Sequence, residues 1–130
     1  MDMPVETTWN RDDVANVATA LSWQARRQPN ATAIHYPQGG AFRKADYASC
    51  TYQELDELSN SYARGLAAYG IVAGTRTALM LTPGLDFFAM FFALFKAGAV
   101  PVVVDPGMGL GRMVRCLEST HPQAFIGIPL

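Results

Sequence analysis

The sequence predicts an α/β fold in which a β-hairpin precedes a parallel βαβαβ sheet flanked by helices. After residue 75, short apolar runs alternate with segments of helical periodicity, in the order strand–helix–strand–helix–strand. Before them, two extended runs flank Pro37-Gln38-Gly39-Gly40, a composition that favours a turn. Apolar strands joined by helices indicate right-handed crossovers and a parallel sheet that is covered on both faces.

The first helix is predicted over Asp12–Arg27, after a leader at residues 1–11. Its two acidic starting residues suit the positive end of the helix dipole, and Arg26 and Arg27 suit its last turn. Trp23 lies opposite the apolar stripe, so it is either a surface residue or a contact for chain outside this sequence. The stripe has helical spacing and consists of Val14, Val17, Ala18, Leu21 and Ala25.

A hairpin and a strongly marked helix follow. The hairpin arms are Ala31–Tyr36 and Ala41–Cys50, and the second arm is polar enough to be partly solvated. Thr51 opens the helix, because its hydroxyl and the carboxylate of Glu54 can form a capping box. Gly70 stands where a left-handed C-terminal cap belongs. Core-facing residues recur between these ends at spacings of three and four, at Leu55, Leu58, Tyr62, Leu66 and Tyr69.

The remainder supplies the parallel sheet. Its most apolar part, Phe87–Val104, has Lys96 as its only charge and approaches the length of a membrane span. Gly98 and Pro101 divide it, which favours two buried elements joined by a turn, and the first of these is apolar all round. The predicted elements are strand Arg76–Leu81, turn Thr82–Gly84, helix Leu85–Ala97, buried strand Val100–Val104, helix Leu110–Leu117 and strand Gln123–Ile128.

The amino-acid composition limits the classes of function that the chain can have. Of 130 residues, 50% are hydrophobic and only 16% are charged, against about 25% in an average domain. A small domain has much surface for its volume, so the deficit of charge indicates apolar surface that further chain covers. The net charge of −1 excludes a basic field for nucleic acid or anionic lipid. The acidic, polar start is no secretory signal, so we expect a cytoplasmic protein with free thiols.

One glycine-rich segment, Gly107–Gly111, lies where a phosphate loop would sit, between a strand and a helix. Arg112 and Arg115 beyond it make an anion site conceivable. The spacing is G-x-G-x-G, however, no Lys-Ser or Lys-Thr follows, and Asp105 brings a carboxylate to the mouth. The sequence therefore favours a flexible turn, with Asp105 as an N-cap or turn former instead of a general base.

The remaining candidate groups give no catalytic, cofactor-binding or metal-ligating assignment. His35 and His121 lack a serine or cysteine motif nearby and are interpreted as structural or surface imidazoles. Cys50 and Cys116 form no metal-ligand spacing and have no flanking feature of a reactive thiolate. A cluster of phenylalanines could line an acyl pocket, although helical spacing favours plain core. The cluster consists of Phe87, Phe88, Phe91, Phe92 and Phe95.

Several blocks, in their order and spacing, resemble the opening of the AMP-dependent synthetases and ligases, the adenylate-forming acyl-CoA synthetase superfamily. They are Thr51-Tyr52-Gln53-Glu54-Leu55, Ala63-Arg64-Gly65-Leu66, Tyr69–Arg76, Ala78–Leu81 and Lys96-Ala97-Gly98-Ala99 leading to Asp105-Pro106. The resemblance covers residues 12–130. Val103–Gly109 and Ala124–Leu130 resemble more narrowly the olefin β-lactone synthetase branch, also described as fatty-acid CoA ligase-like.

The resemblance implies the N-terminal portion of a domain that joins a fatty, in this branch β-hydroxy, carboxylic acid to AMP with ATP and Mg. Coenzyme A or the substrate's own β-hydroxyl then attacks the acyl adenylate. The family's phosphate loop, adenine and ribose contacts and lysine would all follow Leu130, so we expect no activity and no bound cofactor for this chain alone. The expected partner is the C-terminal remainder of the enzyme or a second copy. The alternative is a stand-alone α/β interaction module that pairs through its sheet edge and Trp9 or Trp23.

Overall fold

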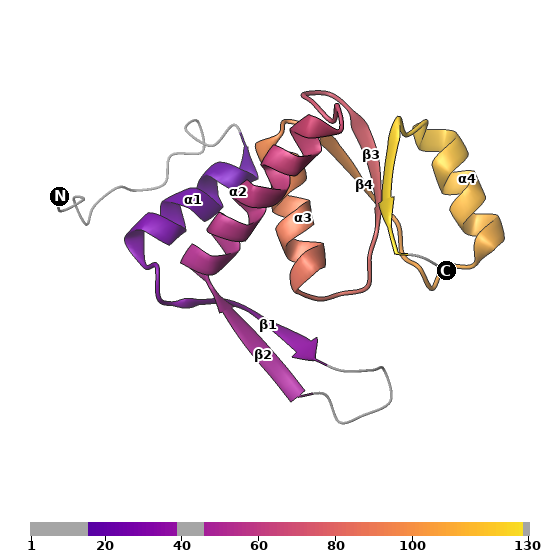
Figure 1. Ribbon diagram of the computed structural model, residues 1–130. Coiled ribbons are helices and arrows are strands. Elements are labelled where there is room, and N and C mark those ends of the chain that lie inside the picture. Colours follow the sequence, from indigo (N-terminus) through magenta and orange to yellow (C-terminus); the bar gives the residue numbers. More distant parts are fainter. Residues whose placement is uncertain (1–15, 39–45, 129–130) are drawn as a thin grey trace.

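A computed structural model describes residues 16–38 and 46–128 and confirms the α/β architecture. Three helices lie on one side of a three-stranded parallel sheet, a fourth lies on the other side, and a two-stranded hairpin projects from the body (Figure 1). The elements are α1 (Val17–Arg27), β1 (Thr32–Gln38), β2 (Asp46–Thr51), α2 (Tyr52–Ala68), β3 (Arg76–Met80), α3 (Leu85–Lys96), β4 (Val100–Val103), α4 (Leu110–Thr120) and β5 (Ala124–Gly127).

Helix α1 starts at a cap that the sequence prediction missed. The side chain of Asn16 accepts a hydrogen bond from the amide of Ala18 at 2.9 Å, while the predicted start at residues 12–14 lies outside the described residues. Ala18, Leu21 and Ala25 are buried as predicted. Val17 is 44% exposed instead, because it stands in the first turn at the rim of a hollow described below. The guanidinium of Arg27 lies 5.0 Å from the ring centre of Trp23.

The hairpin is antiparallel as predicted, but its first strand is longer. Pro37 and Gln38, predicted in the turn, belong to β1 and pair with Tyr47 and Asp46 of β2. A proline fits here because a two-stranded sheet has only edge strands, where a missing N–H costs little. Gly39 and Gly40 of the predicted turn lie outside the described residues.

Helix α2 has the predicted capping box at its start. The amide of Thr51 donates to Glu54 Oε2 at 3.0 Å, and the amide of Glu54 donates to Thr51 Oγ1 at 3.2 Å. At its end Gly70 is left-handed, with φ of +79°. The amide of Ile71 then donates to the carbonyl of Leu66 at 3.0 Å, which turns Ile71 back into the core.

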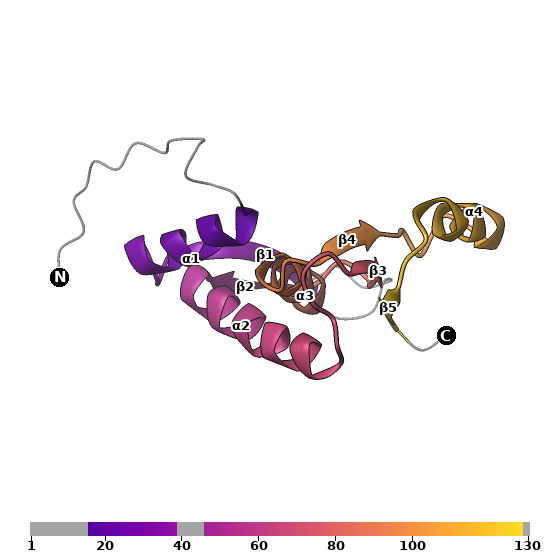
Figure 2. The same cartoon turned by 90° about the horizontal axis from the view of Figure 1, so that it is seen from above.

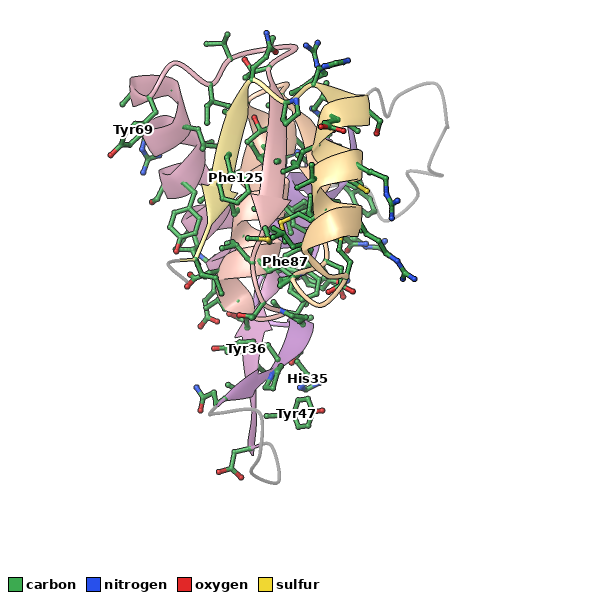
Figure 3. All side chains as sticks on the ribbon, turned by 90° about the vertical axis from the view of Figure 1, so that its right-hand side faces the viewer. His35, Tyr36, Tyr47, Tyr69, Phe87 and Phe125 are labelled. Carbon is green, nitrogen blue, oxygen red and sulfur yellow. The ribbon has the colours of Figure 1, made fainter. Side chains whose placement is uncertain are left out.

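This chain reversal corrects one prediction for α2. Tyr69 was predicted on the core-facing stripe but is 89% exposed and projects from the end of the helix (Figure 3). Ile71, which directly follows the left-handed glycine, is buried against Leu66 in its place. The helical spacing identifies the core-facing side of α2 correctly. The C-terminal cap, however, decides that Ile71 and not Tyr69 is buried at its end.

The sheet has the order β4–β3–β5, and both pairings are parallel. Leu79 of the central strand packs against Ala93 and Leu94 of α3, whereas Ala78 and Met80 form a cluster with residues of α4 on the opposite face. Figures 1 and 2 both place α3 between the α1–α2 pair and the sheet, with α4 beyond the sheet. Coverage of both faces is therefore confirmed for β3.

The outer strands are less covered than predicted. Val104 is buried as predicted, but Val100 and Val103 of β4 are 46% and 52% exposed, so the prediction of a buried strand is wrong for these two residues. The sheet has only three strands, so the helices on its two faces protect the central strand better than the edge strands. The same geometry leaves other apolar residues exposed, at Leu110 and Val114 of α4, Phe125 of β5 and Ile128.

Helix α3 ends where predicted. Gly98 adopts φ of +71°, and its carbonyl accepts from the amide of Gly74 at 2.9 Å. The break separates α3 from β4, and no helix of the described residues is long and apolar enough to cross a membrane. Helix α3 contacts α1, α2 and β4, which confirms burial on more than one side.

Two glycine-to-alanine substitutions should have opposite effects on stability. Gly98→Ala should lower the free energy of unfolding by about 1–2 kcal/mol, because φ is positive and the new Cβ would lie 3.2 Å from Ala73 Cβ. Gly65→Ala, inside α2 with nothing within 4 Å, should raise it by about 0.5–1 kcal/mol. Urea denaturation of both variants checks the signs. A higher free energy of unfolding for Gly98→Ala would contradict the role of Gly98 as a left-handed cap.

Candidate functional site

The glycine-rich segment after β4 forms a turn that its own aspartate closes. Asp105 Oδ1 accepts from the amide of Gly107 at 2.8 Å, and the Asp105 carbonyl accepts from the amide of Met108 at 3.2 Å. Asp105 is thus a turn former, while the N-cap of α4 is Gly109. The carboxylate uses an amide that a phosphate would need and adds negative charge, so this loop does not fit a nucleotide phosphate.

The two histidines lie apart from each other. His35 is exposed on β1, where it pairs with Ser49, and lies on the hairpin away from the sheet (Figure 3). His121 is the left-handed C-cap of α4, with φ of +48°. Its carbonyl accepts from Arg76 Nε at 3.0 Å, and this bond ties the end of α4 to the start of β3.

The cysteines are free. Burial raises the pKa of the buried Cys50 thiol, and the nearby Glu54 carboxylate raises it further, so this thiol stays protonated near neutral pH. Cys116 is half-buried, and its carbonyl accepts from the hydroxyls of Ser119 and Thr120. Within residues 16–38 and 46–128, no group of three or more His, Cys, Asp or Glu side chains could hold a metal ion.

A polar junction at Lys96 was missed by sequence reasoning. Lys96 Nζ lies 2.6 Å from Asp56 Oδ1, 2.7 Å from Asn60 Oδ1 and 3.1 Å from the Asp56 carbonyl. The hydroxyl of Ser22 also donates to Asp56 Oδ1, at 2.9 Å. We call these four residues the Lys96 junction; it joins α1, α2 and α3. The signal was present in the sequence, since a single charge in eighteen apolar residues must find partners when the helix is buried.

All three donors of the Lys96 ammonium are directed at oxygens within the junction. The carboxylate of Asp56 neutralises its charge at the same time. The junction is therefore a structural ion pair and leaves no free donor at Lys96 for a bound anion.

A second contact between α2 and α3 involves Tyr62, whose hydroxyl donates to Asp86 Oδ1 at 2.7 Å. This hydrogen bond, with partial burial, raises the pKa of Tyr62 from 10.0 to about 12. The protonated hydroxyl favours the folded state, so this stabilisation should be complete below pH 10 and disappear as pH rises to about 12.

The alkaline titration gives a direct check of this contact. Tyrosinate absorbance of the chain should show a late-ionising component that Tyr62→Phe removes. Tyr69→Phe should leave that component in place, because Tyr69 is exposed. The assignment would be refuted if the late component survived in Tyr62→Phe.

An apolar hollow of about 500 Å³ lies between α1, the hairpin, α2 and α3. A second hollow of about 420 Å³ shares Val17 and Phe91 with it and reaches Gly98 at the end of α3. We call the two together the α1–α3 trough. The first hollow is lined by Val17, Ala20, Leu21, Gln24, Ala33, Ile34, Tyr52, Leu55, Phe87, Phe88, Phe91 and Phe92. The phenylalanine cluster is thus neither fully packed core nor a closed pocket.

The comparison with protein families matches residues 21–128 to the model described as AMP-binding enzyme. The chain belongs to the AMP-binding enzyme family. This confirms the family inferred from the sequence blocks, and the same blocks now have structural roles. Thr51 and Glu54 cap α2, Gly70 ends it, and Gly98 ends α3.

Two curated relatives of this family member support the narrower branch. The olefin beta-lactone synthetase of Xanthomonas campestris is 48% identical over 119 residues, which are 90% of this chain and 21% of that protein. The olefin beta-lactone synthetase of Stenotrophomonas maltophilia is 46% identical over 118 residues, which are 88% of this chain and 21% of that protein. The chain therefore spans about a fifth of the length of these relatives.

A solved structure agrees on the fold. The fatty acid AMP ligase from Legionella pneumophila matches with a TM-score of 0.77 at 21% identity, over 93% of this chain and 21% of that one. At this identity the match bears on the fold alone. The described residues do not fit an ATP–Mg site, because the turn after β4 is closed by Asp105 and no metal-ligand cluster occurs among them.

Proposed function

We propose that the chain is the N-terminal part of an ATP-dependent ligase that forms an acyl adenylate from a fatty carboxylic acid, specifically a β-hydroxy fatty acid. The 48% identity to an olefin beta-lactone synthetase over 90% of the chain is the observation that carries this proposal. Residues 12–130 are proposed to be the N-terminal portion of the synthetase domain, and residues 1–11 a leader. ATP and Mg would be held by the rest of the enzyme, and the chain alone would be inactive.

The chain would contribute structural scaffold to the synthetase domain and no catalytic residue. Its apolar side chains at the edges of the sheet would contact the remainder of the enzyme, which is consistent with a charged fraction of only 16%. A second copy of the chain is the other proposed partner for these edges. The cytoplasm is the proposed location, supported by the two free thiols.

A chimera tests the proposal. This chain would replace the aligned segment of the Xanthomonas campestris synthetase, and ATP–pyrophosphate exchange would be measured with β-hydroxydodecanoic acid. We expect exchange by the chimera and none by the isolated chain. Exchange by the isolated chain would contradict the scaffold role, and a folded chimera that is inactive with every carboxylic acid tried would contradict the proposed function.

The alternative of a stand-alone interaction module rests on the same exposed edges. It predicts that the isolated chain forms one well-defined oligomer with a cooperative unfolding transition. The ligase proposal predicts aggregation through the exposed apolar edges, without a defined oligomer, when the rest of the enzyme is absent. Size-exclusion chromatography combined with calorimetry separates the two.

A further inference from the structure

The Lys96 junction attaches α1 to the rest of the chain through polar groups. From α1, the Ser22 hydroxyl donates to Asp56 Oδ1 at 2.9 Å, and the same oxygen lies 2.6 Å from Lys96 Nζ. At the start of α1, Asn16 Nδ2 donates to the carbonyl of Phe95 at 2.6 Å. Helix α1 therefore has two polar attachments, one to α2 and one to the end of α3, about 9 Å apart along its axis.

The apolar face of α1 specifies the position of the helix less strictly. Its buried residues are Ala18, Leu21 and Ala25, and Leu21 is the large one among them. Val17 lies one turn before Leu21, and Ala25 lies one turn after it. A shift of α1 by one turn, about 5.4 Å, would therefore still place apolar residues against α2 and α3.

The polar groups respond differently to a shift of α1. Ala18 lies one turn before Ser22 and has no side-chain donor for Asp56. Arg26 lies one turn after Ser22, and in the place of Ser22 it would bring a second positive charge close to Lys96. Either shift therefore gives the Asp56–Lys96 pair a neighbour that fits it less well than the Ser22 hydroxyl.

Main-chain hydrogen bonds after α1 already oppose one of these two shifts. The carbonyls of Pro29 and Ala31 accept from the amides of the first two residues of α2. A shift that moves Arg26 to the place of Ser22 would pull on these bonds, whereas the opposite shift only lengthens the connection between the helices. The polar attachments of α1 are therefore needed against the shift that the main-chain bonds allow.

We propose that the Lys96 junction selects a single placement of α1 on α2 and α3, because a shifted helix leaves the Asp56–Lys96 pair without its donor from α1. The desolvation of a buried ion pair offsets most of the attraction between its charges, so its net contribution to stability is small. A buried charge that loses a hydrogen-bond partner, in contrast, is costly. The inference goes beyond the proposed function, since it concerns how the scaffold keeps one conformation whatever the activity is.

Amide hydrogen exchange of the Ser22→Ala variant tests the inference. This change removes the donor on α1 and leaves the contact between Asp56 and Lys96 in place. Loss of one hydrogen bond to a charged group should speed the exchange of α1 amides by about ten-fold, while the amides of α2 and α3 keep their rates. Unchanged exchange in α1, or equal acceleration in all three helices, overturns the proposal.

Thr19→Ala is the matched control on the same helix. Thr19 is exposed on α1, so its replacement also removes one hydroxyl but leaves the Lys96 junction intact. Both changes to alanine raise the helix propensity of α1, so a difference between the two variants reports the hydrogen bond of Ser22. Thr19→Ala should not speed exchange in α1. Acceleration as large as that of Ser22→Ala overturns the proposal.

Amide NMR spectra of Lys96→Met combined with Asp56→Leu test whether the placement stays unique. Apolar groups replace the ion pair in this double variant, so nothing polar opposes a shift at this position. We expect split or broadened resonances for α1, and a single sharp set for the unsubstituted chain and for Arg64→Met, which changes an exposed charge on α2. A single sharp set for α1 in the double variant overturns the proposal. If the double variant does not fold, the comparison of Ser22→Ala with Thr19→Ala decides.

Discussion

Replacing Lys96 with methionine should lower the free energy of unfolding by about 2–4 kcal/mol. The side chains of Lys96 and Asp56 are only 11% and 19% exposed, so the pair is largely removed from water. Methionine keeps the apolar stem but leaves the Asp56 carboxylate facing Ser22 and the end of α3 without a neutralising charge. Exposed ion pairs contribute about 0–1 kcal/mol, so a loss above that range would identify a buried junction.

Chemical denaturation of the single and double variants measures this effect. Lys96→Met combined with Asp56→Leu should lose clearly less stability than the sum of the two single changes, because the double variant buries no uncompensated charge. Arg64→Met is the matched control, since Arg64 is exposed on α2 and donates to Ser61. If the stability losses of Lys96→Met and Asp56→Leu simply added in the double variant, the two side chains would not be coupled.

Replacing Leu79 with alanine should destabilise the chain by about 3–4 kcal/mol. Leu79 is fully buried in the central strand β3, where its side chain packs against Ala93 and Leu94 of α3. Neighbours on both sides hold the strand in place, so the cavity cannot collapse easily and the cost should lie in the upper part of the usual range.

The control for Leu79→Ala makes the same change at the surface. Leu110→Ala in α4 should change the free energy of unfolding by less than about 0.5 kcal/mol, because Leu110 is 75% exposed. The free energy of unfolding of both variants would be measured by urea denaturation. We expect their m-values to equal that of the unsubstituted chain. Similar losses at the two positions would show that β3 is not the centre of the core.

Features set by neighbours in sequence were predictable. The capping box at Thr51 and the left-handed Gly70 and Gly98 depend on residues within one helical turn, and the structure contains all three. Tyr69 was misplaced because helical periodicity continues past the point where the C-terminal cap turns the chain. Pro37 was misplaced for a related reason, since a proline favours a turn in general but is also tolerated on an edge strand.

Features set by distant contacts were not predictable from spacing. Alternating strands and helices indicate parallel pairing, but the order β4–β3–β5 depends on which side of β3 each crossover takes. The exposure of Val100 and Val103 follows from that order and could not be predicted before it was known. The partners of Lys96 lie thirty-six or more residues away, so the sequence revealed a charge that needed partners without naming them.

The central place of β3 has a consequence for how the chain folds. Its pairing with β4 joins Arg76 to Val100, whereas its pairing with β5 joins Thr77 to Ala124, at about twice the separation along the chain. Closing the longer loop costs about 0.6 kcal/mol more in chain entropy. We therefore expect β4 to dock on β3 before β5 does, so that the nucleus of this sheet is complete while the last crossover is still unfolded.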